Sequence, residues 1–276
     1  TLRAMLFPDH PYRFNPSGSL ESVRALGAAD VRAHYERLVN RSNLVLSIFG
    51  DITVDRAREI AERYLADLPA GERPVLKQGP AHARLPARQQ RAEPREQAIL
   101  LCGFPAVSMD DPRVDALNVL QKALSGLSSD LGIEIREKRG LVYFVGAFSL
   151  MALDPGFFAL YAGTREEAIP EVERLMGDQL ARIAAEGLRE EEFERARAQL
   201  IAAADMGLQN NGELAMACAL HEWHGLGYRY PIELEQRLRA LTPASIRDAA
   251  RELLLEDRKA TAIVVPSRNG KGASDE

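Results

Sequence analysis

One stretch of this sequence occurs twice. Residues 24–50 read RALGAADVRAHYERLVNRSNLVLSIFG, and residues 239–265 read RALTPASIRDAARELLLEDRKATAIVV. At a constant offset (239 − 24 = 215), identical or similar side chains align without a gap. Two such units need 2 × 215 = 430 residues, whereas the chain has 276. We therefore expect the end of one copy followed by a complete second copy, with the front of the first copy missing or supplied by another chain.

The partial first copy carries signals for a helix, a strand and a second helix. A helix is expected over residues 28–39, where apolar side chains recur at helical spacing. The run 43–51 is rich in β-branched and aliphatic residues and ends in Gly-Asp, which predicts a strand. Thr53 predicts the N-cap of a helix over residues 54–65.

A change of composition separates the two copies. Residues 76–96 are rich in Pro, Gly, Ala, Arg and Gln without periodicity, which predicts a linker. Beyond it we expect strands at 98–104, 142–151, 157–164 and 260–265, a helix over 114–124, nearly continuous helix over 166–225, and a last helix that begins at Thr242-Pro243.

These elements come in runs with hairpins, and not as strict βαβ alternation. They predict an α+β fold: a two-layer arrangement of antiparallel sheet with helices on one face, duplicated, with the first copy truncated. The expected domains are residues 1–75 (C-terminal part of the first domain), 76–96 (linker), 97–266 (complete second domain) and 267–276 (flexible tail).

Composition excludes several classes of protein. With 46% hydrophobic and 27% charged residues, the chain is typical of globular proteins. A net charge of −5 argues against a nucleic-acid partner, which needs unopposed Lys and Arg. The apolar runs fall short of the ~20 residues that a transmembrane helix needs, so no transmembrane segment is expected. Cys102 and Cys218 fit no metal-ligand spacing and are expected to be buried thiols.

Residues 128–143 read SSDLGIEIREKRGLVY. This segment resembles the SRLF-x-x-LREK-x-GL-x-Y stretch of the pitrilysin/insulinase-type zinc metallopeptidases and the mitochondrial processing peptidases, where it lies in the domain that does not bind zinc. Residues 6–12 (LFPDHPY) and 43–51 are similar to the LF-x-x-HPY and N-x-x-L-x-x-x-GD stretches in the later part of the family's zinc domain. The matches follow the family's order, and a family of two duplicated domains agrees with the repeat.

The resemblance implies two catalytic residues in this chain. In the family, an Arg and a Tyr seven residues apart reach from the second domain into the active cleft, and Arg136 and Tyr143 have that spacing (143 − 136 = 7). A guanidinium and a phenol aimed at a peptide carbonyl would stabilise the negative charge that its oxygen gains during attack, typically by ~3 kcal/mol per donor. Without the resemblance, the same residues would be an exposed helix end and a packed strand residue.

The family's zinc motif, H-x-x-E-H, does not occur in this chain. By the repeat, its place would lie before Thr1, and the corresponding residues 118–122 of the second copy include no His or Glu. We therefore expect this chain alone to bind no zinc, the zinc belonging to the full-length protein or complex. The HExH sequence at residues 221–224 has no third ligand, and we expect a helix end with Trp223 packed inward.

The function that the resemblance implies is that of a zinc-dependent metalloendopeptidase, which hydrolyses peptide bonds in an enclosed chamber. This chain would contribute substrate binding and transition-state stabilisation, and its expected partners are a peptide or protein substrate and a zinc-bearing domain or subunit, in a homodimer or a heterodimer. The alternative is a catalytically inactive structural subunit of a two-component peptidase or an assembly scaffold. A periplasmic or envelope-associated location is a guess from bacterial relatives.

Overall fold

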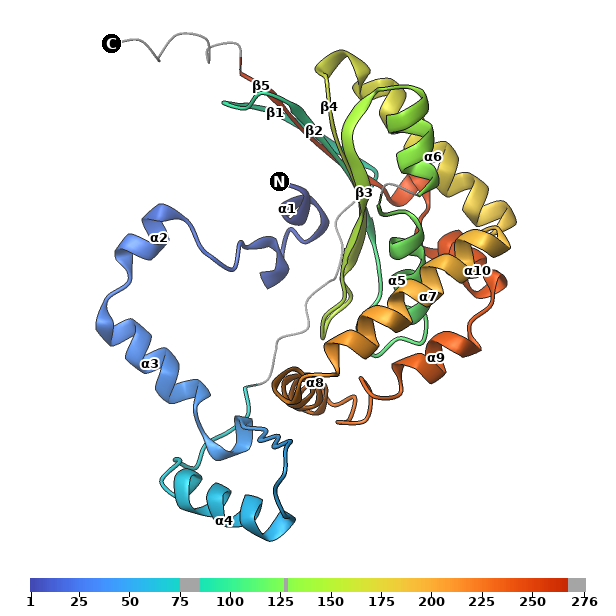
Figure 1. Ribbon diagram of the computed structural model, residues 1–276. Coiled ribbons are helices and arrows are strands. Elements are labelled where there is room, and N and C mark those ends of the chain that lie inside the picture. Colours follow the sequence, from blue (N-terminus) through green and yellow to red (C-terminus); the bar gives the residue numbers. More distant parts are fainter. Residues whose placement is uncertain (75–84, 127–128, 268–276) are drawn as a thin grey trace, which may run out of the picture. The chain divides into compact units, whose positions relative to one another are not determined.

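The computed structural model of the protein describes residues 1–74, 85–126 and 129–267 (Figure 1). The chain forms two compact units. Unit 1 comprises Thr1–Phe14, Gln78–Leu200 and Arg237–Glu276, and unit 2 comprises Asn15–Lys77 and Ile201–Gln236. Neither unit is a continuous stretch of the sequence, and the domain boundaries expected from the sequence stay a prediction.

Unit 1 is built on a five-stranded sheet in the order β1-β5-β2-β4-β3. The strands are β1 (Ala87–Glu93), β2 (Ala98–Pro105), β3 (Val142–Leu150), β4 (Phe157–Thr164) and β5 (Ala260–Pro266). The central strands β2, β4 and β5 are nearly continuous apolar runs because both of their faces are buried. The expected α+β fold with helices beside a sheet is confirmed.

Strand β1 departs from the expectation in two ways. It lies within residues 76–96, which were predicted to be linker, and it pairs with β5 in parallel, so the sheet is mixed and not purely antiparallel. Its sequence, ARQQRAE, has no alternation of apolar and polar residues. Most of the side chains of this edge strand are exposed, so an apolar face is not needed. The sequence signal for a strand is a pattern of apolar residues that become buried, and the sequence of β1 has no such pattern.

Helices cover one face of this sheet. They are α5 (Val114–Ala123), α6 (Ile169–Glu186) and α10 (Pro243–Leu253). Apolar residues of α6 recur every three or four positions and are buried: Ile169, Val172, Met176, Leu180 and Ile183. Each such side chain contributes about 1.5–3 kcal/mol to folding. The helix α10 begins with a capping box between Thr242 and Ser245, as its sequence predicts.

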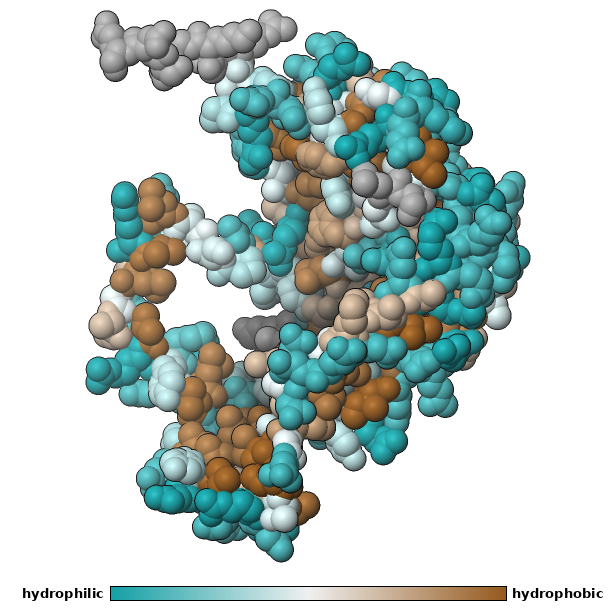
Figure 2. Space-filling view, viewed as in Figure 1, coloured by the Kyte–Doolittle hydropathy of each residue, from teal (hydrophilic) through white to brown (hydrophobic). Residues whose placement is uncertain are grey.

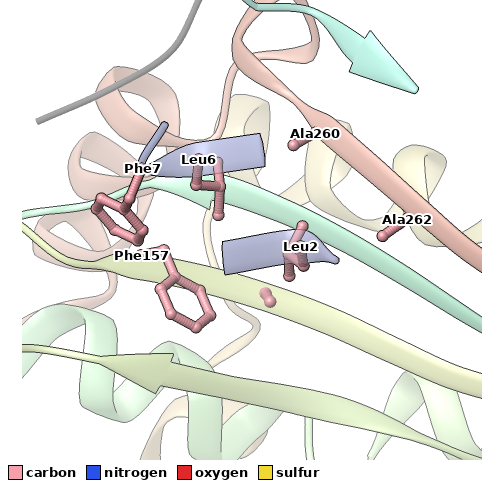
Figure 3. Close-up of a cluster of buried hydrophobic side chains, with 7 residues drawn as sticks. Leu2, Leu6, Phe7, Phe157, Ala260 and Ala262 are labelled. Carbon is pink, nitrogen blue, oxygen red and sulfur yellow. The ribbon is translucent and has the colours of Figure 1, made fainter. Parts of the chain in front are cut away.

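The opposite face of the sheet is covered near β5 by α1 (Leu2–Leu6) (Figures 1 and 3). Leu2, Leu6 and Phe7 pack on the small side chains Ala260 and Ala262, together with Phe157 and Ala159 of β4. The approach is close, since a Cβ at Gly103 of β2 would lie 2.8 Å from a Leu2 methyl group. The start of the chain, assigned to the first domain by the sequence, thus belongs to the core of unit 1.

Unit 2 is helical and has no strand within the described residues. Its helices are α2 (Leu20–Ala25), α3 (Ala28–Leu38), α4 (Val54–Leu65), the end of α7 (Glu190–Gly207), α8 (Asn211–Trp223) and α9 (Leu234–Ala240), the last of which ends in unit 1. Thr53 caps α4 as predicted, accepting from the N–H of Arg56 at 3.3 Å. The strand predicted over residues 43–51 is wrong: most of the segment is irregular, because no other strand of the described chain pairs with it.

The internal repeat recurs as structure. Helix α3 begins at Ala28 and α10 at Pro243 (243 − 28 = 215), and both span 11 residues. The 3₁₀ turns η2 (Arg41–Asn43) and η5 (Glu256–Arg258) keep the same offset (256 − 41 = 215). Elements of the two copies therefore match in type and in bounds.

Candidate functional site

The segment that carries Arg136 begins at a buried serine. Ser129 accepts a hydrogen bond from the N–H of Gly132 (3.0 Å) and donates one to the carbonyl of Gly126 (2.7 Å). The chain then forms η3 (Gly132–Lys138), a π-helical turn, which is a rare conformation that occurs frequently at functional sites. Ile135, which is buried, anchors this turn to the core.

Arg136 differs from the other basic residues of this turn. Lys138 and Arg139 both pair with Glu134, at 3.1 and 3.0 Å, and Arg139 also pairs with Glu171 at 3.4 Å. The hydrogen bond from Lys138, followed by that from Arg139, lowers the pKa of the exposed Glu134 carboxyl. No side-chain partner of Arg136 is found among the described residues, and its side chain is exposed. Its five N–H donors are therefore available to a ligand.

A glycine turn returns the chain from η3 to the sheet. Gly140 has a φ of +61°, a left-handed conformation that side chains disfavour, and its N–H donates to the carbonyl of Arg136 at 3.0 Å. The N–H of Leu141 donates to the carbonyl of Ile135, also at 3.0 Å. At the start of β3, Thr164 of β4 donates its hydroxyl to the carbonyl of Leu141 at 2.5 Å. These bonds fix the end of η3 beside the first residues of β3.

Tyr143 lies in a β-bulge of the edge strand β3. Val142 pairs with Thr164 and Phe144 with Gly163, so Tyr143 is the extra residue between two pairs. Bulges redirect a side chain and are frequent beside active sites. The side chain of Tyr143 is 52% exposed, and no partner of its hydroxyl is found in the described part of the chain.

Two aromatic side chains that sequence reasoning missed lie beside this bulge. The ring of Phe144 covers Gly163, since a Cβ there would come within 2.4 Å of the ring, and Phe144 is 41% exposed. Tyr161 lies next to it, with ring centroids 6.0 Å apart. A glycine opposite an aromatic residue is the only sequence signal for this contact, and it needs the strand register to be read.

The structure places η3 and the bulged start of β3 next to each other, so Arg136 and Tyr143 come from adjacent elements of one unit. Each offers hydrogen-bond donors to solvent. A guanidinium and a phenol without partners among the described residues can each donate to a carbonyl oxygen or another anionic oxygen.

The side chains of the HExH segment, residues 221–224, contact other residues of unit 2. The indole N–H of Trp223 donates to Asn43 at 3.2 Å, and the guanidinium of Arg73 lies over the indole ring, 4.9 Å from its centre. His221 contacts the carbonyl of Ala217 through Nδ1 at 2.7 Å and stacks on Tyr230. Burial lowers the pKa of His224. Trp223 is half-buried, and these contacts hold it within unit 2.

The described residues contain no group of three or more His, Cys, Asp or Glu side chains that could hold a metal ion. His221 and His224 therefore do not fit a zinc site. Both cysteines are buried free thiols, as predicted, and burial raises the pKa of Cys102 to about 12. Among the helices described, none is long and apolar enough to cross a membrane.

Comparison with known proteins gives the family. The sequence model of the peptidase M16 inactive domain matches residues 25–200. The chain belongs to the peptidase M16 family. An uncharacterized zinc protease of Streptomyces coelicolor is 30% identical over 269 residues, which cover 93% of this chain and 57% of that protein. An uncharacterized zinc protease of Bacillus subtilis is 22% identical, over 95% of this chain and 64% of the relative.

Solved M16 structures share the fold. The M16 inactive domain from Pseudomonas fluorescens superposes with a TM-score of 0.86 at 23% identity, over 98% of this chain and 65% of that one. A putative M16-like peptidase from Alicyclobacillus acidocaldarius gives 0.72 at 22% identity, over 96% of this chain and 64% of that one. The chain spans less than two thirds of the length of each of these relatives. The resemblance to zinc metallopeptidases seen in the sequence is confirmed.

Proposed function

We propose that this M16 chain forms the substrate-clasping part of a zinc-dependent endopeptidase. Arg136 and Tyr143 would bind the carbonyl of the peptide bond to be cleaved, and residues outside the 276 of this chain would hold the metal. The observation that carries the proposal is the pair of side chains without described partners, one on a π-helical turn and one in the β-bulge that follows it, with the connecting residues Gly140 and Leu141 hydrogen-bonded back to the turn.

Both side chains suit a carbonyl oxygen that gains negative charge. The Tyr143 hydroxyl and the Arg136 guanidinium are donors, and their backbones are fixed by the bonds through Gly140 and Leu141. Donors that are fixed before the reaction lose little free energy in reorganising, and removing one such donor typically costs ~3 kcal/mol of transition-state stabilisation.

The position of β3 supports a peptide substrate. Because β3 is an edge strand, one side of its backbone is not paired with another strand of the sheet. An extended peptide can add to such an edge through main-chain hydrogen bonds. The exposed rings of Tyr143 and Phe144 would then lie along the bound peptide.

A zinc held outside this chain is part of the proposal, and it is supported by the finding that His221 and His224 do not fit a site and that no other cluster occurs in the described residues. Relatives that carry the name zinc protease support a zinc-bearing part in the family. This chain covers about 57–64% of those relatives, which is consistent with a metal-binding part outside it.

Exposed apolar side chains of unit 2 support an interface with such a part. Val31, Tyr35 and Ile48 are 60%, 61% and 38% exposed. Their counterparts at the 215-residue offset, Ile246 and Ala250 in α10 and Ile263 in β5, are at most 1% exposed. Figure 2 shows hydrophobic side chains gathered on α2 and α3. Such patches indicate a protein interface, here with the rest of a first M16 domain.

A cleavage assay tests the proposal. The full-length gene product should hydrolyse unstructured peptides, a chelator should abolish the activity, and zinc should restore it. Cleavage that survives chelation would contradict the zinc proposal. A full-length product with no activity before chelation would favour the alternative, an inactive partner subunit, in which case Arg136 and Tyr143 would have no catalytic role.

A further inference from the structure

A buried carboxylate of unit 1 takes no part in the proposed clasping of the substrate. Glu192, in the first turn of α7, is only 2% exposed. The backbone N–H and the Nε of Arg189 donate to its Oε2 at 2.9 and 3.1 Å, and Nη2 of Arg182 in α6 donates to it at 3.4 Å. Because buried ions lose their hydration, such a cluster adds little net stability, and in some proteins it fixes one conformation instead.

The same two arginines also hold Asp130. Nη2 of Arg189 donates to Asp130 Oδ1 at 2.5 Å, and Nη2 of Arg182 lies 3.6 Å from Asp130 Oδ2. Asp130 begins the helical segment that continues as η3. We call the four residues Asp130, Arg182, Arg189 and Glu192 the clamp. The clamp joins the connection between α6 and α7 to the first residue of the segment that carries Arg136.

The clamp adds a support at the beginning of η3 to those at its end. At the end, Arg139 pairs with Glu171 of α6 at 3.4 Å, and the N–H of Gly140 donates to the carbonyl of Arg136. The Arg136 side chain itself is exposed and has no partner among the described residues, so the backbone of η3 sets where its guanidinium can reach. A contact that fixes the beginning of this segment therefore also affects the place of Arg136.

The sequence of the clamp differs in charge from the stretch that it resembles. Residues 129–143 align letter by letter with SRLF-x-x-LREK-x-GL-x-Y, and Asp130 then stands where that stretch has Arg. In this chain the residue faces the guanidinium groups of Arg182 and Arg189, which would repel a second cation at this distance. The pairing therefore depends on a carboxylate at position 130, and reversing its charge is a direct test.

We propose that the clamp positions η3 and, through it, the guanidinium of Arg136, so that Asp130 and Glu192 are positioning residues for the substrate carbonyl. The catalytic part of this proposal rests on the proposed function, whereas the ordering of η3 by the clamp does not. A small displacement of a group that contacts the reacting atoms can cost about 10²-fold in rate. The clamp would keep Arg136 in place without touching the substrate.

Amide hydrogen exchange of the full-length protein tests the ordering of η3 without any need for activity. Asp130→Arg should speed exchange of residues 132–138 by about tenfold or more, while β4 (Phe157–Thr164) keeps its wild-type exchange. Combining it with Arg189→Asp restores an opposite-charge pair and should return most of the protection. Unchanged exchange in Asp130→Arg, or exchange in the double variant as fast as in the single one, would overturn the proposal.

Two further variants separate a local effect from a loss of the fold. Asp178→Arg is the matched control, since Asp178 pairs with Arg174 on the exposed side of α6, outside the clamp, and its charge reversal should leave η3 unchanged. Asp130→Asn removes the charge at nearly constant size and should speed exchange in η3 alone. If both Asp130 variants speed exchange of β4 as much as that of η3, the clamp supports the whole unit and the positioning proposal is wrong.

Steady-state kinetics tests the catalytic part. Asp130→Arg should lower kcat by about tenfold or more and change KM by less than about twofold, because the lost contact is made in the transition state, and adding Arg189→Asp should restore kcat. A wild-type kcat in Asp130→Arg, in an enzyme that loses turnover when Arg136 is replaced, would overturn the positioning role. If replacing Arg136 has no effect, the proposed function fails, and the exchange experiment still decides whether the clamp orders η3.

Discussion

The environment of Arg136 distinguishes it from the cations around it. Lys138 pairs with Glu134 and Arg139 pairs with Glu134 and Glu171, whereas Arg136 has no partner among the described residues. The seven-residue spacing between Arg136 and Tyr143 pointed to both residues from the sequence, through the resemblance to the family. The ion pairs of Lys138 and Arg139 with Glu134 could not be predicted from the sequence, because they depend on how η3 folds.

Substitution of Arg136 should affect turnover and not stability. Arg136→Gln in the full-length enzyme should lower kcat/KM by about 10²–10³-fold, because a donor to the developing charge is lost. Arg136→Lys should restore only part of the rate, since an ammonium lacks the planar fork of a guanidinium. The free energy of unfolding should change by less than about 0.5 kcal/mol, because the side chain is exposed.

Arg139→Gln is the control for this experiment. It removes a cation one turn away that is paired with Glu134 and Glu171, and partly exposed ion pairs contribute at most about 1 kcal/mol. Steady-state kinetics with peptide substrates should separate the two positions. Equal rate losses in Arg139→Gln and Arg136→Gln would indicate a general electrostatic effect and not a specific contact.

At the scale of elements, the sequence predicted what burial encodes. The apolar runs of β2, β4 and β5 and the capped helix α10 were found because their sequences carry apolar periodicity or capping residues. Strand β1 was missed because its side chains face solvent. The π-helical form of η3 was missed because no residue pattern separates it from an α-helix.

The run 43–51 shows the opposite error. Its composition is that of a buried strand, and its counterpart at the repeat offset is the central strand β5. A strand, however, exists only when a neighbour pairs with it, and the described residues of unit 2 provide none. The composition of residues 43–51 therefore predicted a strand, which is the conformation that we expect this segment to adopt when another strand pairs with it.

Amide exchange tests that interpretation. The backbone N–H groups of residues 45–49 make no hydrogen bond in the described structure, so they should exchange rapidly in the 276-residue chain. In the full-length protein, where a first-domain sheet would pair with them, exchange should slow by about 10²-fold or more. Hydrogen exchange with mass spectrometry measures both, and equally fast exchange in the two proteins would contradict a completed sheet.

Glu173 of α6 joins the helix layer to the sheet and predicts a pH dependence. It binds Arg88 of β1 at 2.7 Å and Lys259, next to β5, at 3.1 Å. Burial raises the pKa of its carboxyl, but the hydrogen bonds from the two cations outweigh burial and hold the pKa below its usual value. A depressed pKa stabilises the fold above the ordinary value of about 4.3, and this stabilisation is lost as the pH falls below it.

The expected result is a difference between variants that depends on pH. Glu173→Gln should cost about 1–2 kcal/mol of unfolding free energy near pH 7, and the cost should shrink below about pH 4, where the wild-type carboxyl is protonated. Glu256→Gln is the matched control, since Glu256 binds the same Lys259 but is 71% exposed, and it should cost less than about 0.5 kcal/mol. Urea titrations at pH 3.5 and 7 measure the unfolding free energy of each variant. A loss of unfolding free energy in Glu173→Gln that is the same at both pH values would contradict an ionic role for Glu173.

At the scale of the whole molecule, the repeat seen in the sequence organises the chain. Helix α3 recurs as α10, and η2 recurs as η5, at the offset that the sequence gives. The sequence did not predict that each unit is made of segments far apart in the chain, because contacts between distant segments leave no pattern of spacing or composition.

The central claim is that Tyr143 and Arg136 stabilise the substrate carbonyl for a metal centre held outside this chain. The most direct test is the turnover of Tyr143→Phe in the full-length enzyme, with Tyr64→Phe as a control at an exposed tyrosine. Loss of the single hydroxyl should lower kcat by about 10–10³-fold with unchanged thermal stability. A wild-type kcat in Tyr143→Phe would contradict the claim.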